Sequence, residues 1–125
     1  MKASLQGAVT WLPDPADHDY AVAGSYLGLI DDDKKVAPTV SRLRAAAVTQ
    51  FAAKDIFRAS RLSLLGVSDS HVEKERKKLR NGTGLSPILL MRDEPNGSVV
   101  IADGYHRLCA VYGVDEDALV SCKII

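Results

Sequence analysis

The chain has 125 residues, of which 46% are hydrophobic and 26% charged. This length allows one packed domain and is too short for two of ordinary size, so we expect a single domain over residues 1–125. Sixteen basic and sixteen acidic side chains give zero formal charge, so no overall field attracts nucleic acid or an anionic membrane, and an anion site has to be local.

The cysteines and the amino-terminal residues indicate the cellular compartment. Cys109 and Cys122 lie in apolar stretches without a C-x-x-C spacing, which favours reduced core thiols over a disulfide framework or a zinc site. Residues 1–6 lack the apolar run of a signal peptide, and no apolar run approaches the roughly 20 residues of a spanning helix. We therefore expect a cytoplasmic protein without a membrane partner.

A helix is predicted after Pro13 and Pro15, which exclude a helix interior before it. Asp17 or Asp19 is the candidate cap, and apolar side chains recur at helical spacing, namely Tyr20, Ala23, Tyr26, Leu27 and Ile30. The charged run 31–35 breaks this pattern, so the helix is expected to end there.

Two further helices are predicted in the first part of the chain. One spans 39–48, with Pro38 near its start, and a short one lies within 49–60. Residues 1–69 are therefore expected to form a mostly helical part that covers the sheet or the pocket of the second half. Three of its aromatic residues are expected to pack as core or as a dimer surface, namely Trp11, Tyr20 and Tyr26.

The second half begins with a largely exposed helix. Ser68 or Ser70 is the candidate cap, Arg80 is near the last residue, and Asn81-Gly82 is typical of a left-handed stop.

A hairpin and two closing elements follow this helix. Residues 85–91 and 98–102 are predicted strands joined by a turn at 93–97. A helix is predicted over 105–112 and a last strand over 119–125. The predicted fold class is α+β, with a mixed sheet flanked by helices and a helical amino-terminal extension.

The junction between the strand at 98–102 and the following helix has the residues of a phosphate site. The first N–H groups of a helix have no partner within the helix and carry partial positive charge, which favours anions. Gly104 allows close approach to this backbone, while His106 and Arg107 supply directed donors. The alternative is an ordinary strand-glycine-helix turn with a solvated arginine.

The exposed helix supplies a second basic group. His71, Lys74 and Lys78 are spaced by three and four residues and share one face, opposite the apolar positions. A solvated face with Glu73 and Lys77 paired is the alternative interpretation. Together with the glycine junction, the basic face predicts a site for a nucleotide or another small phosphate ligand.

Residues 70–125 resemble the ParB-like and sulfiredoxin-like superfamily. The resemblance lies in the polar helix, Leu-Ser-Pro-Ile-Leu-Leu, the hairpin, Ile-Ala-Asp-Gly-Tyr-His-Arg-Leu-Cys-Ala and a short final strand, and covers less than half of the chain. In the superfamily signature a strand ends in a glycine, which is followed by two further residues, an arginine and then an alanine within the next helix. The glycine, arginine and alanine are here Gly104, Arg107 and Ala110. The resemblance implies a small α+β core over 70–125.

The sulfiredoxin branch implies roles for individual residues. The His and Arg of its Gly-Gly-Cys-His-Arg stretch hold the phosphates of ATP, which implies phosphate contacts for His106 and Arg107. Its polar helix implies nucleotide contacts from the basic helical face. Tyr105 stands where sulfiredoxins have the reactive cysteine, so it lines the predicted site while sulfinic-acid reduction is not implied.

Two other branches widen the range of activities. Chromosome-partition ParB proteins have Gly-Glu-Arg-Arg here and bind CTP, but they read DNA through a further helix-turn-helix domain, so sequence-specific DNA binding is not expected. Free-serine kinases have Asp-Gly-His-His-Arg, which implies catalytic roles in phosphoryl transfer for Asp103 and His106. Asp103 is suited to accept a proton or hold Mg²⁺, and its alternative role is a helix cap.

The sequence thus predicts a domain that binds ATP or CTP, with Mg²⁺ as a candidate companion, acting as a nucleotide hydrolase or phosphotransferase. A non-enzymatic regulatory or partner-binding module is the alternative. A homodimer is a candidate assembly under either hypothesis. A ParB-like nuclease ranks lower, because no carboxylate cluster for a metal is evident and no dedicated metal site is predicted. Under the first hypothesis Arg107→Ala weakens nucleotide binding by about 1.5 to 3 kcal/mol.

Overall fold

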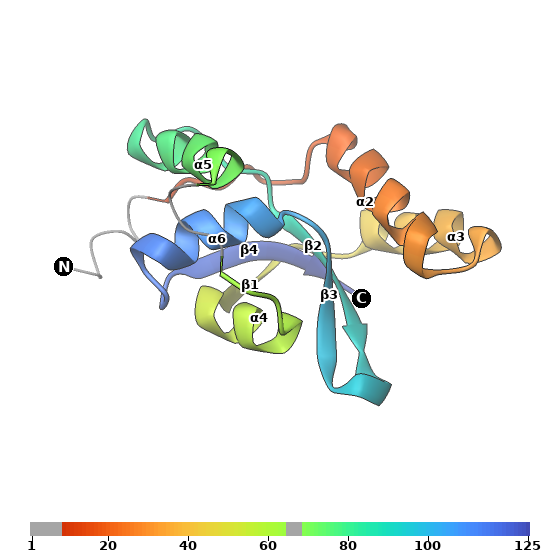
Figure 1. Ribbon diagram of the computed structural model, residues 1–125. Helices are drawn as coiled ribbons and strands as arrows, with labels where there is room; N and C mark the ends of the chain where they lie inside the picture. Colours follow the sequence, from red (N-terminus) through yellow and green to blue (C-terminus); the bar gives the residue numbers. More distant parts are fainter. Residues whose placement is uncertain (1–8, 65–68) are drawn as a thin grey trace.

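The computed structural model describes residues 9–64 and 69–125. The helices are α2 (Asp17–Ile30), α3 (Asp33–Ala45), α4 (Ala53–Ser60), α5 (Ser70–Arg80) and α6 (Tyr105–Val114). The strands are β1 (Thr49–Ala52), β2 (Ile88–Asp93), β3 (Ser98–Asp103) and β4 (Leu119–Ile124), and a 3-10 turn, η1 (Glu94–Asn96), joins β2 to β3. Helices pack around one mixed sheet (Figure 1), which confirms the predicted α+β class.

The sheet has the order β1-β4-β2-β3, so the last strand in the chain lies inside it. β4 runs antiparallel to β1 and parallel to β2, while β2 and β3 form the predicted antiparallel hairpin. Thr49 pairs with Cys122 on one side of β4, and Ile88 pairs with the same residue on the other. The sheet therefore joins the first half of the chain to the second.

Alternation along the strands divides the core into two layers. On β2, Ile88 and Leu90 face the core formed with α4, α5 and α6, whereas Leu89 and Met91 face α2 and α3. The second layer also contains Tyr20, Ala23, Leu27, Leu43 and Ala102. The prediction that the first helices cover the sheet is confirmed for α2 and α3, which cover one face of it.

The structure corrects the predicted start of the first two helices. α2 spans 17–30 as expected, but the residue at its N-cap position is Ala16, and Asp19 accepts a hydrogen bond from the Ala16 N–H at 3.3 Å. α3 begins at Asp33 with Asp32 as the cap, since the Asp32 carboxylate accepts from the Lys34 N–H at 2.8 Å. The charged run 31–35 is thus a helix-start signal.

The other predictions for this region were partly correct. Pro38 lies inside α3, which ends at Ala45 and not at 48. The short helix predicted within 49–60 is present as α4 at 53–60, but residues 49–52 form β1, which was not predicted. Pairing with β4 gives residues 49–52 their extended conformation, and that interaction comes from far along the chain.

The elements of the second half agree closely with the prediction. α5 ends at Arg80 before Gly82, whose φ is 69°. Its cap is Asp69, whose carboxylate accepts from the N–H groups of His71 and Val72, and not Ser70. Ser68 and residues 1–6 lie outside the described residues.

The predictions on the cysteines and on membrane spans can also be compared with the structure. Cys109 and Cys122 are buried and form no disulfide bond, as predicted. Among the described helices, none combines the length and the apolar character that crossing a bilayer requires.

Candidate functional site

The junction of β3 and α6 is built around Gly104. This residue occupies the N-cap position with φ at 106°, in the left-handed region that favours glycine, and no side chain caps the helix. A Cβ there would lie 2.3 Å from Cγ2 of Ile88. Glycine is therefore required by packing against β2, whereas the sequence suggested ligand access as its reason.

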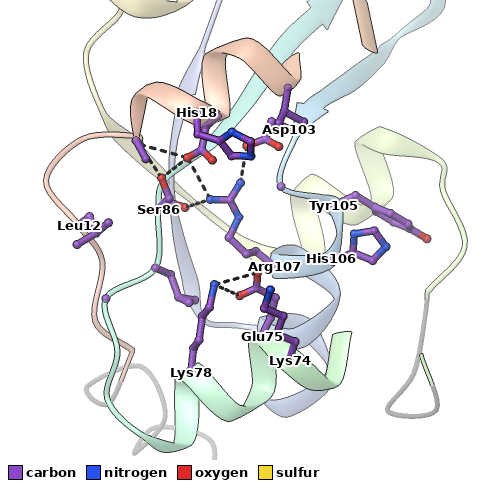
Figure 2. Close-up of a pocket in the computed structure, with 16 residues that line it drawn as sticks. Leu12, His18, Lys74, Glu75, Lys78, Ser86, Asp103, Tyr105, His106 and Arg107 are labelled. Atoms are coloured by element: carbon purple, nitrogen blue, oxygen red, sulfur yellow. Dashed lines mark hydrogen bonds and ion pairs between the residues drawn. The ribbon is translucent and has the colours of Figure 1, made fainter. Parts of the chain in front are cut away.

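A pocket of about 420 Å³ opens at this junction. It brings together seven of the eight predicted site residues (Figure 2), namely Lys74, Lys78, Asp103, Gly104, Tyr105, His106 and Arg107. His71 is the exception: it does not line the pocket, and its ring packs against that of His106 with centroids 4.9 Å apart. The first turns of α5 and α6 therefore lie side by side.

The guanidinium of Arg107 is held by the protein's own groups. Nη2 lies 2.5 Å from Oδ2 of Asp103, and Nη1 lies 2.8 Å from the Ser86 carbonyl oxygen and 3.5 Å from Oδ2 of Asp19. The Arg107 side chain is 10% exposed and both carboxylates are 12% exposed. Arg107 thus lines the pocket but is not a free cation.

Asp19 and Ser86 are site residues that the sequence analysis missed. The Ser86 hydroxyl donates to Asp19, and the Ala16 N–H donates to the Ser86 hydroxyl oxygen at 3.0 Å. One signal was available in the sequence: Asp19 precedes Ala23 and Leu27 at spacings of four, so an acidic side chain lies on the buried stripe of α2. A buried carboxylate requires a partner such as an arginine.

The ionised side chains around the pocket balance in number. Three cations line it, namely Lys74, Lys78 and Arg107, together with three anions, namely Asp19, Glu75 and Asp103. Lys78 pairs with Glu75 at 3.2 Å, whereas Lys74 has no ion-pair partner within the ranges 9–64 and 69–125. The positive charge outside the buried ion pairs of Arg107 therefore comes from α5, and Lys74 is its exposed member.

The ion pairs on the exposed face of α5 differ from those expected for a solvated face, in which Glu73 would pair with Lys77. Glu73 pairs with Arg80 at 2.8 Å and with Arg76 at 3.9 Å, and not with Lys77 as that interpretation expected.

Asp103 is an ion-pair partner and does not cap α6. The N-cap position belongs to Gly104, and no capping bond from a side chain is present, so the cap alternative was wrong. Burial raises the pKa of the Asp103 carboxyl, and the positive charge of Arg107 opposes that rise. A carboxylate with a raised pKa is a stronger base than a solvated one.

Tyr105 and His106 occupy a separate side of the pocket. Figure 2 shows both rings apart from the guanidinium of Arg107. The Tyr105 hydroxyl donates to the Ser63 carbonyl oxygen, and the two rings contact each other with centroids 5.5 Å apart. The two residues with predicted catalytic roles thus have different neighbours, since Asp103 pairs with Arg107 whereas the His106 ring contacts His71 and Tyr105.

Comparison of the chain with models of protein families, with curated proteins and with solved structures finds no match. The resemblance to the ParB-like and sulfiredoxin-like superfamily stays a prediction.

Proposed function

We propose that the pocket binds the phosphate groups of a nucleoside triphosphate, ATP or CTP. The proposal is supported by one observation above the others: Lys74 and Lys78 of α5 line the same pocket as the uncapped N-terminus of α6. Ammonium groups and free backbone N–H groups are complementary to phosphate oxygens. A volume of about 420 Å³ accommodates a ligand of this size.

In this proposal Arg107 is a positioning residue. It orients Asp103 through the contact at 2.5 Å, and Asp19 holds the guanidinium from the other side. Asp103 then acts as the base that takes a proton from a hydroxyl or a water attacking the terminal phosphate, as phosphoryl transfer requires. His106, near the α6 N-terminus, serves as a phosphate contact.

The acidic groups of the pocket are suited to Mg²⁺ only together with a nucleotide. In the ranges 9–64 and 69–125 no group of three or more metal-binding side chains gathers. A magnesium ion shared with a triphosphate needs one or two carboxylates, and Asp19 is the candidate when Asp103 acts as the base. Such an ion would neutralise charge on the phosphates.

Calorimetric titration with ATP, CTP and ADP, with and without Mg²⁺, tests the proposal. Lys74→Ala removes a hydrogen bond to a charged group and is expected to weaken binding by about 1.5 to 3 kcal/mol. Lys77→Ala is the matched control, because Lys77 is on the same helix and does not line the pocket. Absence of binding heat with every nucleotide, or equal losses in the two variants, would contradict the assignment.

Arg107→Ala is a less suitable test than the sequence suggested. The substitution leaves Asp19 and Asp103 buried without their cation, which destabilises the fold as well as the site. A loss of nucleotide affinity in that variant would therefore not separate binding from stability.

A phosphate-release assay distinguishes the enzymatic hypothesis from the hypothesis of a non-enzymatic regulatory module. Turnover that Asp103→Asn abolishes while binding persists favours the hydrolase or phosphotransferase, whereas binding without turnover in the native chain favours the non-enzymatic alternative. The nuclease alternative ranks below both, since the charges of the pocket balance and provide no basic track for a nucleic-acid backbone.

A further inference from the structure

An apolar hollow of about 230 Å³ lies between α4 and one face of the sheet. Each strand contributes one apolar side chain to it and α4 contributes the rest, so that the lining residues are Phe51, Leu90, Val99, Ile124, Asp55, Ile56 and Ala59. Among these residues Asp55 alone is polar. We call this space the α4 hollow, and it shares no residue with the pocket at the junction of β3 and α6.

The α4 hollow has a buried floor and an open side. Leu90 and Ile56 are 1% and 4% exposed, whereas Phe51 on the edge strand β1 is 39% exposed. Apolar walls offer water no hydrogen bonds, so an apolar group that displaces water from the hollow is favoured. Pockets for drug-sized ligands measure roughly 300 to 1,000 Å³. A space of about 230 Å³ is therefore suited to a short chain.

A cationic rim adjoins the α4 hollow. A neighbouring hollow shares Asp55 and Ala59 with it and is also lined by Arg58, Arg61 and Gly97. The two spaces therefore meet along one edge of α4, and a ligand can extend from the apolar space to the arginines. A guanidinium pairs with a carboxylate through two parallel hydrogen bonds. We call Arg58 and Arg61 the arginine rim.

Both arginines of the rim have donors available for a ligand. Arg61 Nη2 donates one hydrogen bond to the Asn96 carbonyl oxygen at 3.0 Å, and a guanidinium has five N–H donors. Arg58 is exposed and has no ion-pair partner within residues 9–64 and 69–125. Arginines near the C-terminus of a helix also balance its negative end. That role alone does not require an apolar hollow beside them.

The acidic groups near the rim leave a single positive charge. Asp55 lines both hollows and offsets one of the two arginines. Asp93 and Glu94 of the adjacent turn line neither hollow, and the Asp93 carboxylate accepts a hydrogen bond from the Asn96 amide at 2.8 Å. A ligand with one negative charge is therefore better matched to this rim than a phosphate with several.

We propose that the α4 hollow and the arginine rim bind a short-chain aliphatic monocarboxylate. The aliphatic tail lies against Leu90 and Ile56, and the carboxylate accepts hydrogen bonds from Arg58 and Arg61. This site is separate from the pocket of the proposed function, so either assignment can fail without the other.

Calorimetric titration of the full chain with acetate, butanoate, hexanoate and octanoate tests the ligand class. Each methylene group that enters the hollow is expected to strengthen binding by about fourfold, until the space is filled. Octylamine has the tail of octanoate with the opposite charge and is expected to bind more weakly. Absence of octanoate binding up to its solubility limit, affinities that do not depend on chain length, or equal affinities for octanoate and octylamine would each overturn the proposal.

Two variants test the position of the site. Arg58→Gln is expected to weaken octanoate binding by about tenfold, as for the loss of a hydrogen bond to a charged group. Arg42→Gln is the matched control, because Arg42 is exposed on α3 and lines neither hollow, and it should bind octanoate as the native chain does. Equal losses in the two variants would contradict the role of the arginine rim.

Ala59→Leu fills the α4 hollow and is expected to abolish octanoate binding, with the circular-dichroism spectrum of the native chain as the check of folding. In the native chain, octanoate should shift the methyl NMR signals of Ile56 and Ile124, which line the hollow. This second measurement does not depend on the variant. Retained affinity in a folded Ala59→Leu variant, or shifts confined to other methyl groups, would overturn the proposal.

Discussion

At the residue scale, Gly104 combines two constraints that act on different atoms. Its φ of 106° disfavours any side chain, and the position of its missing Cβ is occupied by Ile88. Gly82 has the first constraint alone, since φ there is 69° and nothing lies within 4 Å of an added Cβ. The two glycines therefore allow the two effects to be separated.

Gly82→Ala is expected to lower the free energy of unfolding by about 1 to 2 kcal/mol, the cost of a left-handed conformation. Gly104→Ala should lose a further 1 to 3 kcal/mol, roughly, because the new methyl group overlaps Ile88. Urea denaturation of both variants measures the difference. Equal losses would show that Ile88 moves aside at little cost.

The residues of the site divide according to how far their partners lie along the chain. Gly104 to Arg107 and the lysines of α5 were predictable, because a strand-glycine-helix junction and a spacing of four are local patterns. The contact of Arg107 with Asp19 joins residues 88 positions apart, and that of Ser86 with Asp19 spans 67. No local pattern in the sequence specifies such distant partners. The sequence therefore could not predict that the Arg107 guanidinium is bound by groups of the protein itself.

At the scale of elements, α5 is capped by Asp69, the residue just before its first residue Ser70. The Asp69 carboxylate accepts from the His71 N–H at 2.9 Å and from the Val72 N–H at 3.1 Å, which satisfies two groups that the helix leaves free. Because Lys74 and Lys78 of α5 line the pocket, the cap that stabilises the first turn of α5 also helps to hold these lysines in place.

Asp69→Ala is expected to lower the free energy of unfolding by about 1 kcal/mol, and Ser70→Ala by less than about 0.5 kcal/mol. Chemical denaturation of the two variants checks the ranking. A larger loss in Ser70→Ala would identify the serine as the cap after all.

Elements with their own start and stop signals were predicted well. The hairpin, α5 and α6 adjoin glycines at Gly82, Gly97 and Gly104, and their bounds agree with the structure to within a few residues. β1 was missed because Thr49 to Ala52 is short and becomes a strand only by pairing with β4. α3 was misplaced because Pro38 was taken as a start signal, although Asp32 supplies the cap.

At the scale of the whole molecule, the two halves form one sheet and one site. β1 from the first half pairs with β4 from the second, and α2 and α3 cover Leu89 and Ala102. Asp19 of the first half binds Arg107 of the second. Residues 70–125, the segment predicted to form a core of its own, therefore depend on the first half of the chain.

The fragment 70–125 is expected not to fold cooperatively, since it lacks a strand, one layer of the core and a partner of its buried arginine. Thermal unfolding followed by circular dichroism, with the full chain as control, checks this. A cooperative transition close to that of the full chain would contradict the expectation.

The position of β4 has a consequence for biosynthesis. Residues 119–124 form the strand between β1 and β2, so before they are translated the sheet can contain only the β2–β3 hairpin. β1, which is made early, then has no strand to pair with, and long-range pairing of this kind slows folding. Nascent chains that lack β4 are therefore expected to be candidates for chaperone binding.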